Sequence, residues 1–289
     1  MVKHALLACL GVMLCSCQEL DLKGLFVPTG EGVQRRFEQS QEINPDLKAA
    51  TLSDEASYRF YAATDPHIVE SHRNLSTFNN ALRNDGEASF GVVLGDCIGV
   101  RDNLPRYLGA LAYDPAQHSF DPTIFHTLGN HDIFFNGWEQ YRASIGPSVY
   151  WFEVSFPGGK DLFITLDTAT GTLGRKQTQW FREFLADKRS DYRHCIIFTH
   201  TNFFYTDTSQ SSSGNMPFEE SIALIDFLGR HNVALVLQGH DHYREDILFD
   251  GVRYCVLGAI LDGGKNAEYL IVDIGPDAIN LHWQQLSEQ

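Results

Sequence analysis

Positive charge is scarce in this sequence of 289 residues. Its 22 Lys and Arg residues stand against 37 Asp and Glu residues, which gives a formal net charge of -15 at pH 7. A strongly negative surface repels a phosphate backbone, so DNA and RNA are poor candidates for a partner. The sequence also shows no internal repeat at the periods typical of solenoid proteins. A local cationic site, such as a bound metal ion, is compatible with this charge.

Cysteine is equally scarce outside the N-terminal segment. Three of the six cysteines lie within the first seventeen residues, and the others are Cys97, Cys195 and Cys255. Three cysteines cannot form a complete disulfide framework. Cys195 and Cys255 lie in apolar runs, where an unpaired cysteine usually acts as a small buried hydrophobic residue. Their spacing also excludes a zinc ribbon.

The N-terminal apolar run is too short to cross a bilayer. It extends from Ala5 to Leu14 after Lys3, whereas a spanning helix needs about 20 residues, so it is typical of a secretory signal peptide. The end of the run resembles the lipobox of bacterial lipoproteins, and Cys17 fits the acylated position because it follows the small Ser16. We expect residues 1–17 to be a lipoprotein signal peptide. The protein would be exported to the periplasm, outer membrane or cell surface and anchored through Cys17; an ordinary signal peptide with incidental cysteines is the alternative.

The segment after the signal peptide differs in composition from the rest. Residues 18–53 are polar and are broken up by glycine and proline, so we expect a tether that packs at most in part. No linker of domain-separating length follows. With 43% apolar and 12% aromatic residues, the chain can bury a substantial core, and residues 54–289 are expected to form one domain.

Strand-like and helix-like apolar runs alternate along this domain, as in βαβ units. The expected strands are residues 58–63, 90–94, 124–128, 195–198, 233–237, 253–257, 269–272 and 279–283, and the expected helices lie around 75–82, 180–185 and 222–228. Several strands lack polar alternation, which indicates that both of their faces are covered. The pattern predicts an α/β protein of layered sheets flanked by helices.

Side chains that can bind metals follow five of these strands. They are Asp65 and His67, then Asp96, then Asn130, then His200, and finally His240 and His242. Because ligands of α/β sheets gather outside the carboxyl ends of strands, this placement predicts that all five groups share one rim. Two carboxylates, one amide and four imidazoles exceed the needs of one tetrahedral ion, so two ions are implied. Oxygen and imidazole donors without thiolates suit Mn, Fe, Zn or Co.

The ordered motifs D-x-H, GD, GNHD, a single H and GHxH resemble those of the calcineurin-like metallophosphoesterase family over residues 58–283. The resemblance implies a four-layer αββα sandwich of two mixed sheets and a dinuclear metal centre. It implies that Asp65, His67, Asp96 and His242 bind one ion and that Asp96, Asn130, His200 and His240 bind the other. Asp96 would then bridge the two ions.

The same resemblance suggests catalytic roles for two further residues. His131 would protonate the leaving oxygen, and Asp132 would orient His131. A hydroxide between two close metal ions can attack phosphorus in line. Asp241, which alternates with the two flanking histidines, is expected to be structural rather than a ligand.

The sequence departs from many family members at Gly99, where an acidic residue or a tyrosine would follow the GD motif. This departure argues against the purple acid phosphatase branch. Cys97 is expected to be a buried residue that packs beside the site, and the alternative is that it acts as a soft metal ligand. Two groups of aromatic residues could line a substrate pocket or pack in the core: Phe134, Phe135, Trp138 and Tyr141, and Phe203, Phe204 and Tyr205. Residues 206–215 could form a lid or an inert surface loop.

Together, these features predict a secreted, lipid-anchored hydrolase that cleaves small phosphate mono- or diesters with two transition-metal ions. The alternatives are a non-catalytic metal-binding surface protein and a dinuclear-metal hydrolase of a non-phosphate bond. Retention of a leaving-group acid argues against the binding protein. The sequence predicts no particular oligomeric state.

Overall fold

The computed structural model describes residues 31–43, 50–51, 56–99, 101–204 and 216–286. The predicted signal peptide, the first part of the predicted tether and the candidate lid at 206–215 lie outside these residues. Among the described residues, no helix has the length and apolarity needed to span a membrane.

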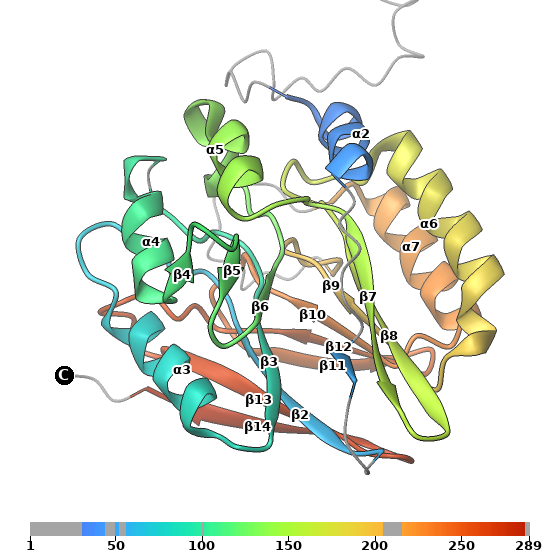
Figure 1. Ribbon diagram of the computed structural model, residues 1–289. Coiled ribbons are helices and arrows are strands. Elements are labelled where there is room, and N and C mark those ends of the chain that lie inside the picture. Colours follow the sequence, from blue (N-terminus) through green and yellow to red (C-terminus); the bar gives the residue numbers. More distant parts are fainter. Residues whose placement is uncertain (1–30, 44–49, 52–55, 100, 205–215, 287–289) are drawn as a thin grey trace, which may run out of the picture.

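Two sheets face each other at the centre of the molecule (Figure 1). The seven-stranded sheet has the order β1-β7-β8-β9-β10-β12-β11, and its strands are β1 (Ala50–Thr51), β7 (Tyr150–Phe156), β8 (Gly159–Thr165), β9 (Cys195–Phe198), β10 (Leu235–Gln238), β11 (Glu245–Phe249) and β12 (Val252–Val256). The five-stranded sheet has the order β14-β13-β2-β3-β6, and its strands are β2 (Tyr58–Ala63), β3 (Ala88–Val93), β6 (Ile124–His126), β13 (Glu268–Ile274) and β14 (Ile279–Gln285). Both sheets are mixed: β8, β9, β10 and β12 pair in parallel in the larger sheet and β2, β3 and β6 in the smaller one, whereas the pairs β7–β8, β11–β12, β2–β13 and β13–β14 are antiparallel.

Helices cover the outer face of each sheet. On the five-stranded sheet lie α3 (Arg73–Asn84) and α4 (Leu104–Ala110), and on the seven-stranded sheet lie α6 (Gly174–Lys188) and α7 (Phe218–Arg230). The remaining helices are α2 (Val33–Ile43), α5 (Gly137–Ser144) and the 3₁₀ turns η1 (Arg101–Asn103), η2 (His131–Asn136) and η3 (Arg189–Asp191); β4 (Tyr113–Asp114) and β5 (Ser119–Phe120) form a small hairpin. The predicted four-layer αββα sandwich of two mixed sheets is confirmed.

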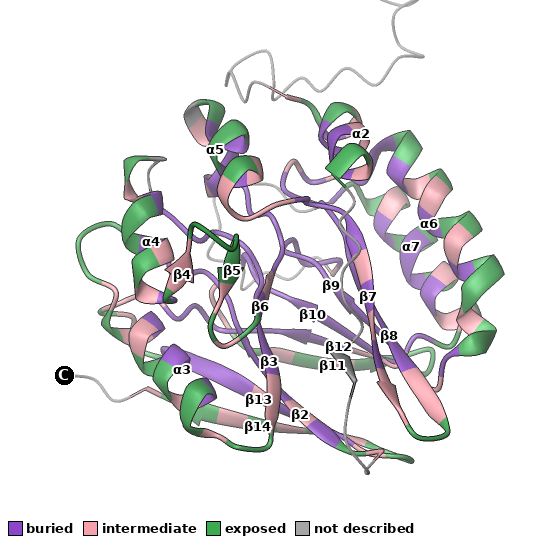
Figure 2. Ribbon diagram, viewed as in Figure 1, coloured by how far each residue is buried: buried purple, intermediate pink, exposed green. Residues whose placement is uncertain are grey.

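The central strands are buried on both faces, as their lack of alternation predicts (Figure 2). In β2, Phe60 and Ala62 point between the sheets, whereas Tyr61 and Ala63 pack under α3 and α4. The strands of the seven-stranded sheet divide their side chains in the same way between the inter-sheet core and the layer of α6 and α7. The apolar runs are therefore continuous because each strand contacts two apolar layers.

Several elements were absent from the sequence-based prediction, namely α2, α4, α5, the β7–β8 hairpin and β11. In β8, a buried carboxylate interrupts the apolar pattern. Asp161 accepts hydrogen bonds from Tyr58 Oη at 3.0 Å and from Arg193 Nε at 3.0 Å. Its partners are distant in sequence, so a local pattern cannot reveal that this charge is satisfied inside the fold.

Part of the predicted tether is a packed helix. Residues 33–43 form α2, which packs beside α6. Arg36 lies at its centre, and Arg36 Nε lies 2.8 Å from Asp167 Oδ2 with both side chains fully buried. Trp138 Nε1 donates to Gln39 Oε1 at 2.6 Å, and β1 adds a parallel edge strand beside β7. Within the described residues, α2 and β1 of the predicted tether therefore pack onto the domain that follows.

Candidate metal centre

The five polar motifs meet at one rim of the sandwich. They follow β2, β3, β6, β9 and β10, all of which are parallel strands within their sheets. Beyond the strands, backbone hydrogen bonds continue between the loops, as from Asp65 N to Gly95 O and from Gly239 N to His200 O. These backbone hydrogen bonds hold neighbouring loops close together. The predicted convergence of the five motifs on one rim is therefore observed.

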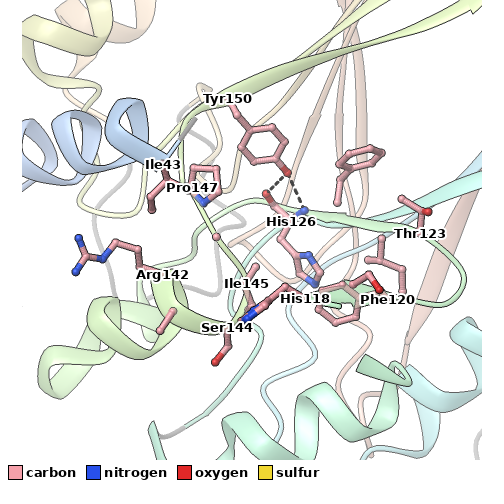
Figure 3. A pocket seen from close by; sticks show the side chains of 15 residues that line it. Ile43, His118, Phe120, Thr123, His126, Arg142, Ser144, Ile145, Pro147 and Tyr150 are labelled. Atoms are coloured by element: carbon pink, nitrogen blue, oxygen red, sulfur yellow. Dashed lines mark hydrogen bonds between the residues drawn. The ribbon is translucent and has the colours of Figure 1, made fainter. Parts of the chain in front are cut away.

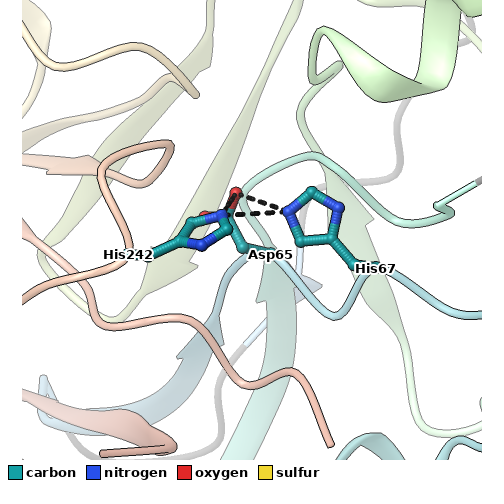
Figure 4. Close-up of side chains that lie close together, drawn as sticks. All are labelled: Asp65, His67 and His242. Atoms are coloured by element: carbon teal, nitrogen blue, oxygen red, sulfur yellow. Dashed lines mark hydrogen bonds and ion pairs between the residues drawn. The ribbon is translucent and has the colours of Figure 1, made fainter. Parts of the chain in front are cut away.

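One group of side chains consists of Asp65, His67 and His242 (Figure 4). The two Nε2 atoms of the histidines lie 3.0 Å apart. Asp65 Oδ1 lies 3.2 Å from His242 Nε2 and 3.5 Å from His67 Nε2. The three donor atoms thus surround a single point, although His67 and His242 are 175 residues apart in sequence.

The second group consists of Asp96, His200 and His240, with the amide of Asn130 beside it. His200 Nε2 lies 3.5 Å from Asp96 Oδ1, 3.2 Å from His240 Nδ1 and 3.1 Å from Asn130 Oδ1. All four side chains are buried. The Nδ1 atom of His200 lies 2.8 Å from the carbonyl of Leu94, which orients the ring so that Nε2 points into the group.

Asp96 connects the two groups. Its Oδ2 atom lies 3.6 Å from His67 Nε2, while its Oδ1 atom faces His200. The carboxylate is almost completely buried and also accepts a hydrogen bond from the backbone N–H of His131 at 2.8 Å. The seven predicted ligand residues therefore lie together in two adjacent groups, with Asp96 between them.

The donor distances fit metal ions. Donors held at about 2.1 Å from one ion lie about 3.0 Å apart in an octahedron and about 3.4 Å apart in a tetrahedron. The donor separations given above run from 3.0 to 3.5 Å within the groups and reach 3.6 Å between His67 and Asp96. Asp65 Oδ1 is buried and makes no hydrogen bond in the described structure, although a buried carboxylate oxygen normally has a partner. A cation between Asp65, His67 and His242 would satisfy this oxygen.

An unusual backbone accompanies the donor residues. Positive φ angles occur at Asp65 (52°), His67 (42°), Asp96 (50°), His240 (73°) and His242 (60°). Residues other than glycine rarely adopt positive φ angles because their Cβ atom crowds the backbone. Such backbone strain is found mainly at functional sites. Five of the seven predicted ligands share this feature, which aims side chains of consecutive motifs toward one point.

Two glycines allow the motifs to approach so closely. A Cβ on Gly129 would lie 2.0 Å from the backbone nitrogen of Asp96, and one on Gly239 would lie 2.7 Å from Asp65 Oδ2. Both contacts are shorter than any that real Cβ atoms make. The glycines of the GNHD and GHxH motifs are therefore required by the packing of one loop against another.

The groups also attract positive charge. Burial lowers the pKa of His200, but the charge and close contact of Asp96 outweigh it and raise that pKa to about 10. Burial and the charge of His200 lower the pKa of His240 to about 4. The carboxylates therefore favour a positive charge beside the ring nitrogens of His200 and His240, as expected of a site that binds cations.

His131 lies at the open side of the two groups. Its Nε2 atom is 4.0 Å from Asp96 Oδ2, and its ring centroid is 4.6 Å from that of His67. Its side chain is 34% exposed, so a bound molecule can reach it. Burial lowers the pKa of His131 below its ordinary value, opposed by the charge of Asp96 and by the backbone of Gly99. This location is compatible with the predicted contact to a leaving group.

Asp132 contacts the backbone of two neighbouring loops. Its carboxylate accepts hydrogen bonds from Gly129 N at 2.9 Å and from Ile98 N at 3.4 Å. Among the described hydrogen bonds, none joins Asp132 to His131, whose Nδ1 atom is buried without a partner. Burial and the charge of Asp96 raise the pKa of Asp132 to about 7. Asp132 therefore ties the GNHD loop to the neighbouring loop, which positions His131 through the backbone.

The residues expected to be structural are buried away from the ring nitrogens. Asp241 is fully buried and accepts a hydrogen bond from Asn202 Nδ2 at 2.8 Å. Cys97 is fully buried in the apolar cluster beneath α3 and α4, and burial raises its pKa well above the ordinary value. A protonated thiol in an apolar wall is a poor metal ligand.

The aromatic residues divide between core and surface. Trp138, Tyr141 and Phe203 are buried in apolar clusters, and Phe204 packs at the edge of one. Phe134 is half-buried, and its ring centroid lies 4.7 Å from that of His131. The side chain of Phe135 and the whole of Tyr205 lie outside the described part of the chain. Phe134 is thus the aromatic residue described at the mouth of the site.

Thr64 was missed in the sequence. It is fully buried, and its hydroxyl donates to Asp65 Oδ2 at 2.6 Å. This hydrogen bond leaves Asp65 Oδ1 facing His67 and His242. The only indication in the sequence was a hydroxyl residue directly before the D-x-H motif. A threonine at the end of a strand is too common to predict that it orients a metal ligand.

A separate cavity of about 480 Å³ lies away from the metal centre, beside β6 and the segment after α5 (Figure 3). Its lining includes His126, Ile145 and Tyr150 but none of the seven predicted ligands. The Tyr150 hydroxyl donates to the carbonyl of His126 at 2.8 Å and accepts from its N–H at 3.0 Å. These bonds satisfy the outer edge of β6 and hold the cavity wall together.

Many solved structures resemble this chain, and three of them illustrate the shared fold. A dimetal phosphatase from Danio rerio is 14% identical, with a TM-score of 0.57 over 79% of this chain and 96% of that chain. A purple acid phosphatase from yellow lupin (Lupinus luteus) seeds is 14% identical, with a TM-score of 0.59 over 80% of this chain and 52% of that chain. The GAP50 anchor of the inner membrane complex of Plasmodium is 15% identical, with a TM-score of 0.56 over 79% of this chain and 84% of that chain. Identities this low establish a common fold alone.

Direct comparison with curated protein sequences gives no match. The model of the calcineurin-like phosphoesterase family, by contrast, matches residues 58–244, which is more than half of the chain. The matched range contains all five motifs and every residue of the two donor groups. The chain therefore belongs to the calcineurin-like phosphoesterase family, and this membership supports the activity of a phosphoric ester hydrolase.

Proposed function

We propose that this protein hydrolyses small phosphate mono- or diesters with two transition-metal ions, Mn, Fe or Zn, held by the seven donor residues. The observation that carries the proposal is the gathering of these donors in two adjacent groups, with Asp96 of the second group 3.6 Å from His67 of the first. Asp65, His67, Asp96 and His242 would hold one ion, and Asp96, Asn130, His200 and His240 the other. When bound, such a pair lowers the pKa of water and neutralises charge on a phosphoryl group.

Other residues of the chain orient the donors, position a loop and supply a proton. The hydrogen bond from Thr64 and the contact between His200 and the carbonyl of Leu94 orient two of the donors before an ester arrives. The Asp132 carboxylate fixes the loop that carries His131. His131 is 34% exposed beside Asp96, where its ring can hold a proton close to the departing oxygen. The acidic surface disfavours nucleic acid as a substrate.

Replacing His131 with alanine is expected to reduce turnover without removing the metals. Loss of a general acid lowers rates by about 10²- to 10⁴-fold, and the loss is largest for poor leaving groups because they depend on protonation. The measurement compares p-nitrophenyl phosphate with an alkyl phosphate, and the corresponding diesters, for the manganese-loaded protein and His131→Ala. Elemental analysis of both proteins should give the same metal content.

His72→Ala is the matched control, since His72 lies outside the motifs and bonds only to Ser76 among the described side chains. It should retain the wild-type rate with each ester. Equal rate losses for good and poor leaving groups in His131→Ala would contradict the role as an acid.

A binding protein without catalytic activity is the second candidate. The fold is compatible with such a role, since one neighbour of similar fold is described as an anchor of a membrane complex. The exposed position of His131 supports the hydrolase instead, because a binding protein needs no proton donor at the open side of its metals. Two bound metals without turnover of any phosphate ester would favour the binding protein or a hydrolase of another bond.

We also propose that the protein is exported and anchored through a lipid on Cys17. The support is the short apolar run followed by Ser16-Cys17. Cys17→Ser is expected to abolish incorporation of radiolabelled palmitate in cells and to release the protein from the membrane fraction. Cys15→Ser should retain the label, and loss of label in Cys15→Ser alone would contradict the assignment.

A further inference from the structure

The location of His131 determines where the leaving group of a bound ester lies. A proton donor must approach to about 3 Å from the oxygen that it protonates. The carbon skeleton attached to that oxygen must then lie against the neighbours of His131. These neighbours come from the η2 turn and from the paired loops that follow β2 and β3.

Phe134 forms one side of this surface. It lies three residues after His131 in the η2 turn, and residues three apart in a 3₁₀ turn project from the same side. The two rings are accordingly close, with centroids 4.7 Å apart and planes inclined by 49°. Phe134 is half-buried, so part of its ring is accessible beside His131.

Val69 lies on one of the two loops that border His131. Residues 67–69 run parallel to residues 96–99, with hydrogen bonds from His67 N to Asp96 O at 3.0 Å and from Gly99 N to Ile68 O at 3.0 Å. Val69 is 49% exposed, although it is apolar. The ring of His67 lies 4.6 Å from that of His131, and the backbone of Gly99 affects the pKa of His131, so both loops border His131.

Val69 also explains the glycine at position 99. A Cβ on Gly99 would lie 2.6 Å from Val69 Cγ2, which is closer than real Cβ atoms approach. The valine therefore occupies the space that an acidic or phenolic side chain at position 99 would need. An apolar residue thus replaces a polar group at the edge of the metal centre.

Val69, Gly99 and Phe134 have no charged or hydrogen-bonding side chain. A polyol or sugar against them would lose hydrogen bonds to water, whereas an alkyl or aryl group would gain from burial. We infer that these three residues form a leaving-group subsite that selects phosphoric esters of apolar alcohols, alkyl or aryl. The inference rests on the proposed function, because it takes His131 as the group that meets the leaving oxygen.

The test measures binding of two non-hydrolysable phosphonates to the manganese-loaded protein by calorimetry. Hexylphosphonate is expected to bind about tenfold more tightly than 2,3-dihydroxypropylphosphonate, which corresponds to burial of about two methylene groups. Phe134→Ala and Val69→Asn should each reduce this ratio to about three or less. Leu248→Ala removes an apolar side chain that is 76% exposed on the edge strand β11, and it should retain the full ratio.

Equal affinities in the wild-type protein, binding of neither phosphonate, or a ratio unchanged in both subsite variants would overturn the inference. Hydrolysis of hexyl phosphate and glycerol phosphate separates this inference from the proposed function. Turnover without a binding preference overturns the subsite and leaves the hydrolase. A binding preference that the variants abolish, without turnover of either ester, supports an apolar binding surface but overturns the proposed function and with it the role of this surface as a leaving-group subsite.

Discussion

Asp96→Asn is expected to remove metal ions and turnover together. Asp96 faces His67 through one oxygen and His200 through the other, so both groups lose a charged donor at once. Elemental analysis should show fewer than two ions per chain after dialysis. Turnover of phosphate esters should decrease about a thousandfold or more, because metal ions contribute several kcal/mol to the transition state and about 1.4 kcal/mol corresponds to a factor of ten.

Asparagine has the size of aspartate, so the buried site keeps its volume and its acceptor for the His131 N–H. The matched control is Asp246→Asn on β11, where the carboxylate pairs with Arg253 at the surface and is 36% exposed. An exposed pair contributes at most about 1 kcal/mol, so this variant should keep both ions and its full turnover. Two ions retained in Asp96→Asn would refute the shared-ligand arrangement.

Arg36→Ala is expected to lower the free energy of unfolding by about 3–5 kcal/mol. The guanidinium donates to both oxygens of Asp167, at 2.8 and 3.0 Å, and both side chains are fully buried. Removing one partner leaves a charge in the protein interior with only Ser148 and the backbone of Ala169 as further contacts. Denaturation in urea, followed by circular dichroism, measures this change.

The neighbouring arginine provides the control. Arg35 is 51% exposed and pairs only with glutamates on its own helix, so Arg35→Ala should cost less than about 1 kcal/mol. The double variant Arg36→Ala, Asp167→Ala should be less destabilised than the sum of its single variants, since no unpaired charge remains. Equal, small effects of Arg35→Ala and Arg36→Ala would show that α2 contributes little to the stability of the domain.

Sequence patterns fail for α2 for a physical reason. The helix buries Arg36, Gln39 and Ser40 along with two apolar residues, Val33 and Phe37. A pattern of apolar and polar residues assigns polar side chains to the surface, and it cannot represent a charge that finds its partner 131 residues away. The same failure hides Asp161 in β8, which pairs with Tyr58 and Arg193.

The central strands were predicted well because their side chains carry the information locally. Cys195–Phe198 and Leu235–Gln238 are buried on both faces, so every position is apolar or has a partner in the next layer. Such runs indicate covered parallel strands whatever the rest of the chain does. Because carboxyl ends of parallel strands share an edge, the order of strands and polar motifs already predicts one common rim.

The sequence by itself thus determined the types of donor, their order and their placement after strands. Only the tertiary structure decided how closely these donors approach one another, that Asp132 accepts hydrogen bonds from Gly129 and Ile98, and that Val69 fills the space beside Gly99. The sequence predicts donor types and strand ends because each strand or turn depends mainly on residues that are close to it in sequence. Distances of about 3 Å between residues such as His67 and His242 depend on strand order and on loops held with positive φ, which belong to the folded chain as a whole.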